Sequence, residues 1–330
     1  MIWAIFFLEI TRIPALAQDK QMKFDLPINC ELGQDCWFMN YVDVDPDTGV
    51  ARDFTCNKRS YEGHKGTDIA IRSFEEVEAG VDVRAVASGT VLRLRDGEAD
   101  GFRNDDEMDE LRQARKECGN GIIIDHGEGW LSQYCHLKQG SISVKPEDKV
   151  RRGQNIAKVG LSGISAHPHI HLSLLHNGEH VDPFTGQKQY EGCGLETVAP
   201  LWREKTVKYE PFALYDGGFI GGRPVFSEIS RGIKEPFANK DSDILSFWGV
   251  YFGAKPGDKI HMSFKDPNGE VLTSQDITQD EIKARQYYFI GKRKPQTGWT
   301  RGTYIAEMIV SRDIEGETVT RTLKKALDIF

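Results

Sequence analysis

The sequence predicts a mainly β protein built from two successive antiparallel units, the first of which contains a helical insertion. Three observations support this fold class. Short runs that alternate apolar and polar residues recur along the chain and are separated by turn residues. The charged segment Glu98 to Cys118 interrupts this pattern, and Asp105 to Lys116 within it has helical character. Beyond about Tyr209 a new series of strand-like runs begins, which predicts a small β-sandwich.

Five runs predict the strands of this sandwich, and turns rich in proline, glycine and asparagine separate them. The runs are Phe247 to Phe252, Lys259 to Lys265, Arg285 to Ile290, Thr303 to Val310 and Thr318 to Leu323. We find no catalytic constellation among these residues. At the other end of the chain, Phe24 to Asp45 reads as an irregular lead-in to the first sheet.

Length and composition favour a globular protein with two domains. The chain has 330 residues, and its hydrophobic share of 39% is enough for packed cores. The net charge of -8 and the pI near 5.7 give no broad basic face, so nucleic acid and anionic membrane surfaces are poor partners. The sequence has no apolar run of the length that a membrane-spanning helix needs.

The first residues resemble a secretory signal. A short apolar run from Ile2 to Leu8 is followed by Ala15-Leu16-Ala17, a small-residue cleavage pattern, although no basic residue precedes the run. We therefore expect residues 1–17 to be a signal peptide and the protein to be periplasmic or secreted, in the envelope of a Gram-negative cell. Six cysteines, an even number, fit an oxidising compartment.

One cysteine pair can be predicted from a hairpin. The runs Gly121 to Asp125 and Trp130 to His136 indicate two strands joined at Gly127-Glu128-Gly129. This hairpin would bring Cys118 and Cys135 nearly opposite one another, so we expect a disulfide between them. The other four cysteines remain unassigned: Cys30, Cys36, Cys56 and Cys193.

Two histidines share one face of a predicted strand near the middle of the chain. A period of two puts His169, His171 and Ser173 on one face and apolar residues on the other. Upstream, flanking glycines place His64 in a turn that leads to Asp68, at the start of another strand. Zinc accepts imidazole and carboxylate ligands, and three protein ligands leave a fourth position open, as in a catalytic site.

Four short motifs, in this order, resemble the lysostaphin/LytM-type zinc metallopeptidases, which are peptidoglycan endopeptidases. They are H-x-x-x-D at 64–68, Y-x-H-L at 134–137, V-x-x-G-x-x-I-x-x-V-G at 150–160 and H-x-H at 169–171. The resemblance covers about residues 24–190. It implies a LytM-like antiparallel β-sheet peptidase domain, which we expect at residues 18–205, followed by the sandwich at 206–330.

The resemblance also implies roles for five residues. In that family the His and Asp of the first motif and the second His of H-x-H hold zinc, and these positions are His64, Asp68 and His171 here. The His of Y-x-H-L and the first His of H-x-H flank the reacting water, and they correspond to His136 and His169. With no H-E-x-x-H glutamate present, proton transfer falls to these imidazoles. The sequence does not divide the roles between them.

His167 leaves a second frame open, in which His167 and His169 form the H-x-H pair. Pro168 would interrupt a strand that begins at residue 167, whereas the alternation continues past His171. We therefore expect the frame of His169 and His171.

These features predict an exported zinc endopeptidase that hydrolyses the peptide cross-links of peptidoglycan. One alternative is a non-catalytic LytM-like envelope protein that binds and activates a cell-wall amidase. Such relatives typically lack the zinc ligands, whereas this chain retains all three. Another alternative is an adhesion or scaffold protein that is dominated by the sandwich and keeps a vestigial peptidase half. The intact site argues against both, but the unexplained sandwich keeps the second alternative open.

Overall fold

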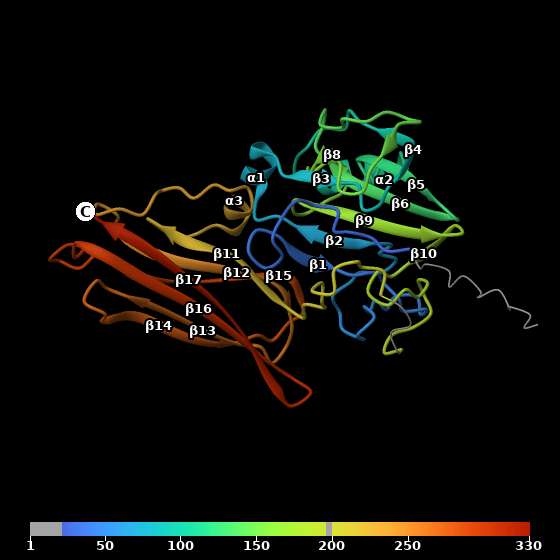
Figure 1. The fold of residues 1–330 in the computed structure, drawn as a ribbon. Coiled ribbons are helices and arrows are strands. Elements are labelled where there is room, and N and C mark those ends of the chain that lie inside the picture. Colours follow the sequence, from blue (N-terminus) through green and yellow to red (C-terminus); the bar gives the residue numbers. More distant parts are fainter. Residues whose placement is uncertain (1–21, 196–199) are drawn as a thin grey trace, which may run out of the picture.

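The computed structural model describes residues 22–195 and 200–330 (Figure 1). The signal peptide predicted at residues 1–17 lies outside these described residues. Within the described ranges, no helix is both long enough and apolar enough to cross a membrane.

An antiparallel eight-stranded sheet forms the N-terminal unit, as the sequence predicts. Its strand order is β1-β2-β9-β6-β5-β4-β7, and β10 pairs with β9. The strands are β1 (Trp37–Asn40), β2 (Thr67–Ala70), β4 (Gly89–Arg95), β5 (Asn120–Gly127), β6 (Trp130–Leu137), β7 (Lys149–Val150), β9 (His169–His176) and β10 (Glu179–Val181). A separate two-stranded sheet joins β3 (Asp82–Arg84) to β8 (Asn155–Lys158), and α1 spans Phe74–Ala79.

The alternation predicted for the H-x-H strand is present in β9. Ile170, Leu172 and Leu174 are buried in the main core of this unit, so His169 and His171 belong to the other face. β9 lies between β2 and β6 in the sheet. Side chains from both neighbouring strands can therefore meet the two histidines.

The expected irregular lead-in from Phe24 to Asp45 contains an ordered strand, so that expectation was wrong in part. β1 pairs antiparallel with β2, and this pairing sets Asn40 opposite Asp68. The run Trp37-Phe38-Met39 shows no polar alternation because all three side chains are buried. A strand that is covered on both faces loses the period of two that identifies a half-buried strand.

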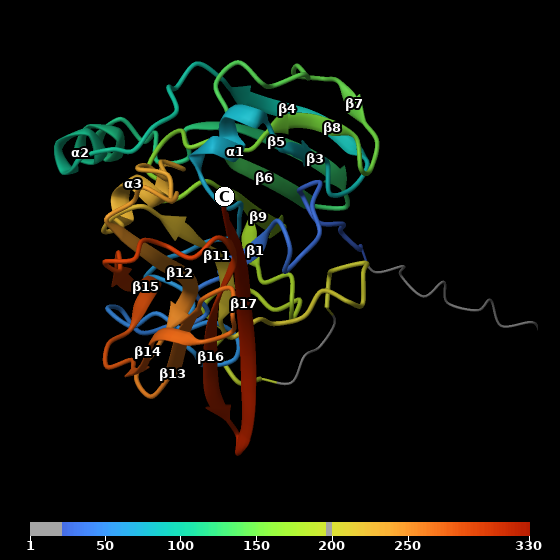
Figure 2. The same ribbon diagram turned by 90° about the vertical axis from the view of Figure 1, so that its left-hand side faces the viewer.

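The helical insertion predicted between two core strands is confirmed. α2 (Asp105–Gln113) begins with a capping box, in which the side chains of Asn104 and Glu107 each accept a hydrogen bond from the other's backbone N–H. None of its residues is buried, and Figure 2 shows the helix projecting from the sheet.

The C-terminal unit is a sandwich of two antiparallel sheets, as the sequence predicts. One sheet has the order β11-β12-β15 and the other the order β14-β13-β16-β17. The elements are β11 (Ala213–Ile220), α3 (Phe226–Ser230), β12 (Ile244–Ala254), β13 (Lys259–Lys265), β14 (Val271–Thr278), β15 (Lys283–Arg293), β16 (Gly302–Ile314) and β17 (Glu317–Ile329). Phe247 from one sheet and Met262 and Met308 from the other belong to a single core.

Two strands of the sandwich, β11 and β14, do not appear among the runs predicted from the sequence. β11 contains Gly217 and Gly218, a residue type that is depleted in strands. A Cβ atom at position 217 would lie 2.3 Å from the Leu323 side chain, so the glycine permits close packing there. The domain boundary that we predicted at residues 205 and 206 stays a prediction.

The two units share an apolar core. Trp37, Met39 and Ala70 of the first sheet pack in one cluster with residues of the sandwich that include Tyr215 and Trp248. In Figure 1, β1 and β2 lie on the side of the first unit that adjoins the sandwich. The units are therefore packed against each other, and the chain does not merely tether them.

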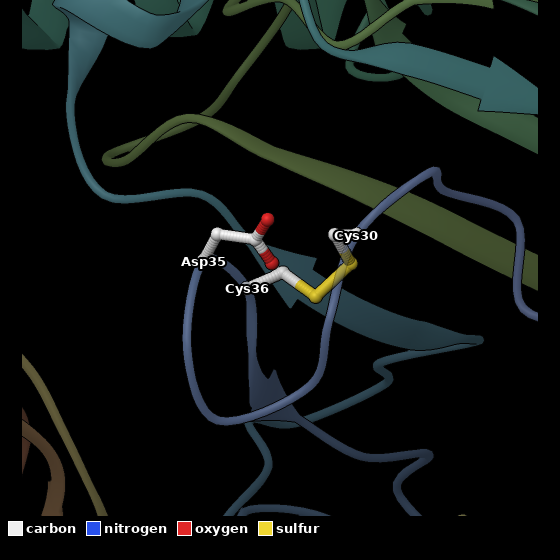
Figure 3. Close-up of side chains that lie close together, drawn as sticks. All are labelled: Cys30, Asp35 and Cys36. Atoms are coloured by element: carbon white, nitrogen blue, oxygen red, sulfur yellow. A yellow bond between two sulfur atoms is a disulfide. The ribbon is translucent and has the colours of Figure 1, made fainter.

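All six cysteines form disulfides, which join Cys118 to Cys135, Cys30 to Cys36 and Cys56 to Cys193. The pairing predicted from the hairpin is confirmed. Figure 3 shows Asp35 beside the Cys30–Cys36 bond, a grouping that resembles a metal site by composition. Because thiolates are the sulfur ligands of metals, two cysteines that are bonded to each other do not supply such a site.

We predict that loss of the Cys118–Cys135 bond lowers both stability and activity. The double variant Cys118→Ser/Cys135→Ser should lose about 2–4 kcal/mol of unfolding free energy in a denaturant titration, because the bond restricts the unfolded chain. Activity should fall as well, because Cys135 directly precedes His136.

The matched control is Cys30→Ser/Cys36→Ser, which opens a loop with a sequence separation of 6, compared with 17 for the first bond. A shorter loop restricts the unfolded chain less, so this variant should lose less stability. Peptide mapping of the unreduced protein provides the direct check, and free thiols at positions 118 and 135 would refute the prediction.

Candidate metal centre

Three side chains on one face of the sheet converge within hydrogen-bonding distance of one another. Asp68 Oδ1 lies 3.1 Å from His64 Nε2 and 2.8 Å from His171 Nδ1, and the two nitrogens are 3.1 Å apart. The register of the sheet accounts for this convergence, because β2 and β9 pair with Asp68 opposite His171. His64 lies in the turn before β2. These are the three residues that the sequence analysis selected as zinc ligands.

Glycine at position 66 allows this close approach. A Cβ atom there would lie 2.6 Å from His171 Nε2 and 2.5 Å from the carbonyl oxygen of Leu172, distances that real Cβ atoms do not show. Any side chain at position 66 would therefore displace the imidazole of His171.

The hydrogen bonds around the three residues fix which atoms face one another. His64 Nδ1 donates to the carbonyl oxygen of Tyr41 at 2.6 Å, so the Nε2 of the neutral ring carries a lone pair. This lone pair faces the carboxylate of Asp68, whose other oxygen accepts a hydrogen bond from the Asn40 amide at 2.9 Å. Two buried acceptors at this distance repel each other unless a proton or a cation lies between them.

The donor set fits a zinc ion. Two imidazole nitrogens and one carboxylate oxygen are ligands that zinc accepts, and all three donor atoms lie within 4.8 Å of one another. Burial raises the pKa of Asp68, but His64 and His169 outweigh this effect and hold that pKa well below its usual range. Asp68 is therefore a carboxylate, the form that binds a metal.

Two further imidazoles lie beside this group, and both were selected from the sequence. His136 and His169 are tilted against each other with ring centroids 4.7 Å apart. His136 Nδ1 donates to the carbonyl oxygen of Ser162 at 2.8 Å, and His169 Nδ1 donates to that of His167 at 2.7 Å. In both neutral rings Nε2 therefore remains available for proton transfer. His169 Nε2 lies 3.4 Å from Asp68 Oδ1.

The surroundings move the pKa values of these two imidazoles in opposite directions. Burial, together with the neighbouring His169 and His171, lowers the pKa of His136 to about 3. Burial also lowers the pKa of His169, but the carboxylate of Asp68 outweighs this effect and the net shift is upward. The protein groups alone therefore favour a neutral His136 beside a more basic His169.

His136 has an unusual backbone conformation, with a φ of 61° in the left-handed region. Its N–H donates to the carbonyl oxygen of Cys118 at 2.9 Å, and its own carbonyl oxygen accepts from the N–H of Gly160 at 2.9 Å. These bonds hold the strained residue from both sides. Such strain is common where a side chain must be aimed at a functional site.

An open cleft of about 790 Å³ leads to the centre. Charged and polar side chains line it, and Arg112 and Glu117 come from the insertion that contains α2. The insertion predicted from the sequence thus contributes to the wall of the cleft. Tyr61 and His180 also line the cleft, although the sequence analysis did not select either.

Asn40, whose amide donates to the second oxygen of Asp68, was not predicted from the sequence either. No local pattern identifies it, because it is brought to Asp68 by strand pairing across 28 residues. The sequence signal for Tyr61 is its position three residues before His64, in the same glycine-containing turn, which brings it close to the centre.

His167, the alternative member of the H-x-H pair, lies apart from the three donors. Its Nε2 donates to the carbonyl oxygen of Ile71 at 2.8 Å, and its Nδ1 accepts from Arg285 at 2.9 Å. Both ring nitrogens are thus occupied elsewhere. The geometry supports the frame in which His171 joins His64 and Asp68, and the ligand roles of these residues remain a proposal.

The region that contains these residues matches a known protein family. The family model described as "Peptidase family M23" matches residues 62–183. The chain is 39% identical to the peptidoglycan DD-endopeptidase ShyA of Vibrio cholerae over 119 residues, and this match covers 36% of this chain and 22% of that protein. It is 31% identical to the murein hydrolase activator NlpD of Escherichia coli over 121 residues, and this match covers 37% of this chain and 25% of that protein. The chain thus spans 25% or less of the length of these relatives.

Two peptidases are among the solved structures to which part of the chain is similar. A zinc containing peptidase from Vibrio cholerae is 23% identical, with a TM-score of 0.34 over 49% of this chain and 39% of that chain. The catalytic domain of lysostaphin from Staphylococcus simulans is 23% identical, with a TM-score of 0.28 over 44% of this chain and 86% of that chain. Together with the family match, the motifs and the antiparallel sheet show that residues 62–183 form a domain of peptidase family M23, the LytM/lysostaphin family.

Proposed function

We propose that this protein is a zinc endopeptidase that hydrolyses the peptide cross-links of peptidoglycan. The observation that carries this proposal is the convergence of His64 Nε2, Asp68 Oδ1 and His171 Nδ1, with His136 and His169 beside them. A site that only bound a ligand would not need two further imidazoles with available nitrogens next to a metal-binding set. The similarity to a peptidoglycan DD-endopeptidase supports this choice of substrate.

Each residue of the centre has a chemical task in this proposal. His64, Asp68 and His171 hold the metal. Zinc bound there supplies a Lewis acid that polarises a peptide carbonyl and lowers the pKa of water. His136 and His169 can take a proton from water and return it to the leaving amine, because both keep Nε2 available.

The cleft suits a substrate that carries both charges. Lys65 and Arg112 contribute positive charge to its lining, and Glu62 and Glu117 contribute negative charge. Stem peptides of peptidoglycan present free carboxylates and amines along a short chain. The peptide would lie across these residues with its scissile bond at the metal.

Export to the cell envelope accompanies this function. Three disulfides indicate an oxidising compartment. The chain is also 32% identical, over 121 residues, to a protein named outer membrane antigenic lipoprotein B of Haemophilus influenzae. We therefore propose that the protein acts in the periplasm or outside the cell.

A second candidate function is the activation of a murein amidase. The similarity to proteins named murein hydrolase activators favours it. The complete set of donor atoms and both neighbouring imidazoles favour the enzyme instead, since an activator needs neither.

We predict that single substitutions will separate metal binding from turnover. His64→Ala, Asp68→Ala and His171→Ala should each abolish stoichiometric zinc binding and hydrolysis, because each removes one of three ligands. His169→Ala should retain zinc but lower kcat by about 10²- to 10⁴-fold, the usual contribution of a positioned acid or base. Zinc content by elemental analysis and kcat on a cross-linked muropeptide are the two measurements. Zinc retained by His171→Ala but lost from His167→Ala would show that the other H-x-H frame is correct.

We also predict that a protein of residues 18–330, which lacks only the expected signal peptide, acts directly on intact sacculi. Cross-linked muropeptide dimers should disappear while the glycan strands stay intact, and a chelator should stop the reaction because the ligands lose their metal. Muropeptide chromatography after digestion measures this loss. If the zinc-loaded protein cuts nothing but accelerates an added amidase, the activator function is the correct one.

A further inference from the structure

We infer that Arg285, a residue of the C-terminal sandwich, positions the imidazole of His169 in the candidate metal centre by acting through His167. This inference rests on the proposed function and deepens it. It gives the sandwich a part in catalysis, although the catalytic motifs all lie in the first unit.

The guanidinium of Arg285 clamps two consecutive residues of the loop before β9. Its Nη1 donates to His167 Nδ1 at 2.9 Å, and its Nη2 donates to the carbonyl oxygen of Ala166 at 2.9 Å. The group also stacks on Phe226, at 5.2 Å from the ring centroid. The rigid fork of arginine suits such a two-point contact, whereas lysine offers only a point charge.

His167 is inserted into the sandwich. Only 1% of its surface is exposed, and its ring packs edge-on against Tyr215 and Phe252 at centroid distances of 5.4 and 5.6 Å. Both aromatic residues belong to the sandwich, on β11 and β12. A side chain of the first unit is thus enclosed by residues of the second.

Arg285 fixes the tautomer of His167. Arginine is always a donor, so His167 Nδ1 must accept and the ring proton must lie on Nε2. Nε2 then donates to the carbonyl oxygen of Ile71 at 2.8 Å. Burial and the adjacent guanidinium lower the pKa of His167 well below its usual value, so the ring stays neutral. In this protonation state His167 links Arg285 of β15 to Ile71, the residue that follows β2.

The same residue orients His169. The carbonyl oxygen of His167 accepts the Nδ1–H of His169 at 2.7 Å, and it also accepts the hydroxyl of Ser165 at 2.8 Å. The direction of His169 Nε2 therefore depends on the position of the peptide group at residue 167. Arg285 holds that residue by its side chain and holds the preceding residue by its carbonyl oxygen. Outer partners of this kind commonly change activity by about 10- to 100-fold when they are removed.

Other contacts already hold the two units together. The shared apolar cluster joins Trp37 and Met39 to Trp248 and its neighbours. An ion pair between Arg72 and Asp216 adds a second link. Removal of Arg285 should therefore affect the geometry at His169 more than the docking of the sandwich.

The first test compares substitutions at position 285 in the zinc-loaded full chain. Arg285→Met should lower kcat by about 10- to 100-fold, with KM changed by less than about twofold and with one zinc per chain retained. Arg285→Lys should recover part of kcat, because an ammonium can still donate to His167 Nδ1. Arg223→Met is the matched control. Arg223 packs on Phe289, which lies on β15 with Arg285, and this variant should keep the wild-type kcat.

A double-mutant cycle tests whether the effect passes through His167. His167→Phe keeps an aromatic ring against Tyr215 and Phe252 but removes the hydrogen bonds of His167 Nδ1 and Nε2. In this background Arg285→Met should cost little further in kcat, because residues that act in series are not additive. Losses that multiply independently would overturn the inference.

A spectroscopic test requires neither zinc nor substrate. In zinc-free protein with ¹⁵N-labelled histidine, long-range ¹H–¹⁵N spectra should show His167 as the neutral Nε2–H tautomer. Arg285→Met should shift the Nδ1 signal of His167 and also the signals of His169, whereas Arg223→Met should shift neither.

Unchanged His169 signals together with an unchanged kcat would overturn the inference and leave the proposed function standing. If the wild type hydrolyses nothing, the proposed function fails, and these spectra still decide whether Arg285 controls His169.

Discussion

The pairing of β2 with β9 is the constraint on which the centre depends. This register sets Asp68 opposite His171 and Ala70 opposite His169, so one pair of strands supplies both a carboxylate and two imidazoles. A slip of one residue would turn either set of side chains into the core. The buried alternation of β9 prevents that slip, because the apolar residues of its other face have no alternative place. The hydrophobic core thus holds the polar centre in register.

Elements whose contacts join residues close in the chain could be predicted from the sequence. The H-x-H strand, the capped helix and the Cys118–Cys135 hairpin each depend on residues close in the chain, the last with a separation of 17. Contacts between residues far apart in the chain could not be predicted. Asn40 reaches Asp68 from a strand that is buried on both faces and shows no alternation. Arg285 meets its partner across 118 residues, and no motif on either side marks the contact.

The placement of the sandwich explains why the motifs of an M23 domain do not describe the whole molecule. The motifs end with β9, yet the loop before that strand is held by aromatic residues and a guanidinium from the sandwich. The same unit also covers the apolar side chains of Trp37 and Met39 on β1. One packing surface therefore buries part of the first sheet and also fixes the geometry beside the centre.

The left-handed backbone at His136 has a consequence for how this protein can change. A non-glycine residue in that region carries a strain of about 1–3 kcal/mol. Glycine or asparagine would accept the same conformation more readily. Replacing His136 by either residue should therefore relieve backbone strain while it removes the imidazole that lies beside His169. At this position a gain in stability and the loss of the side chain from the centre come with the same substitution.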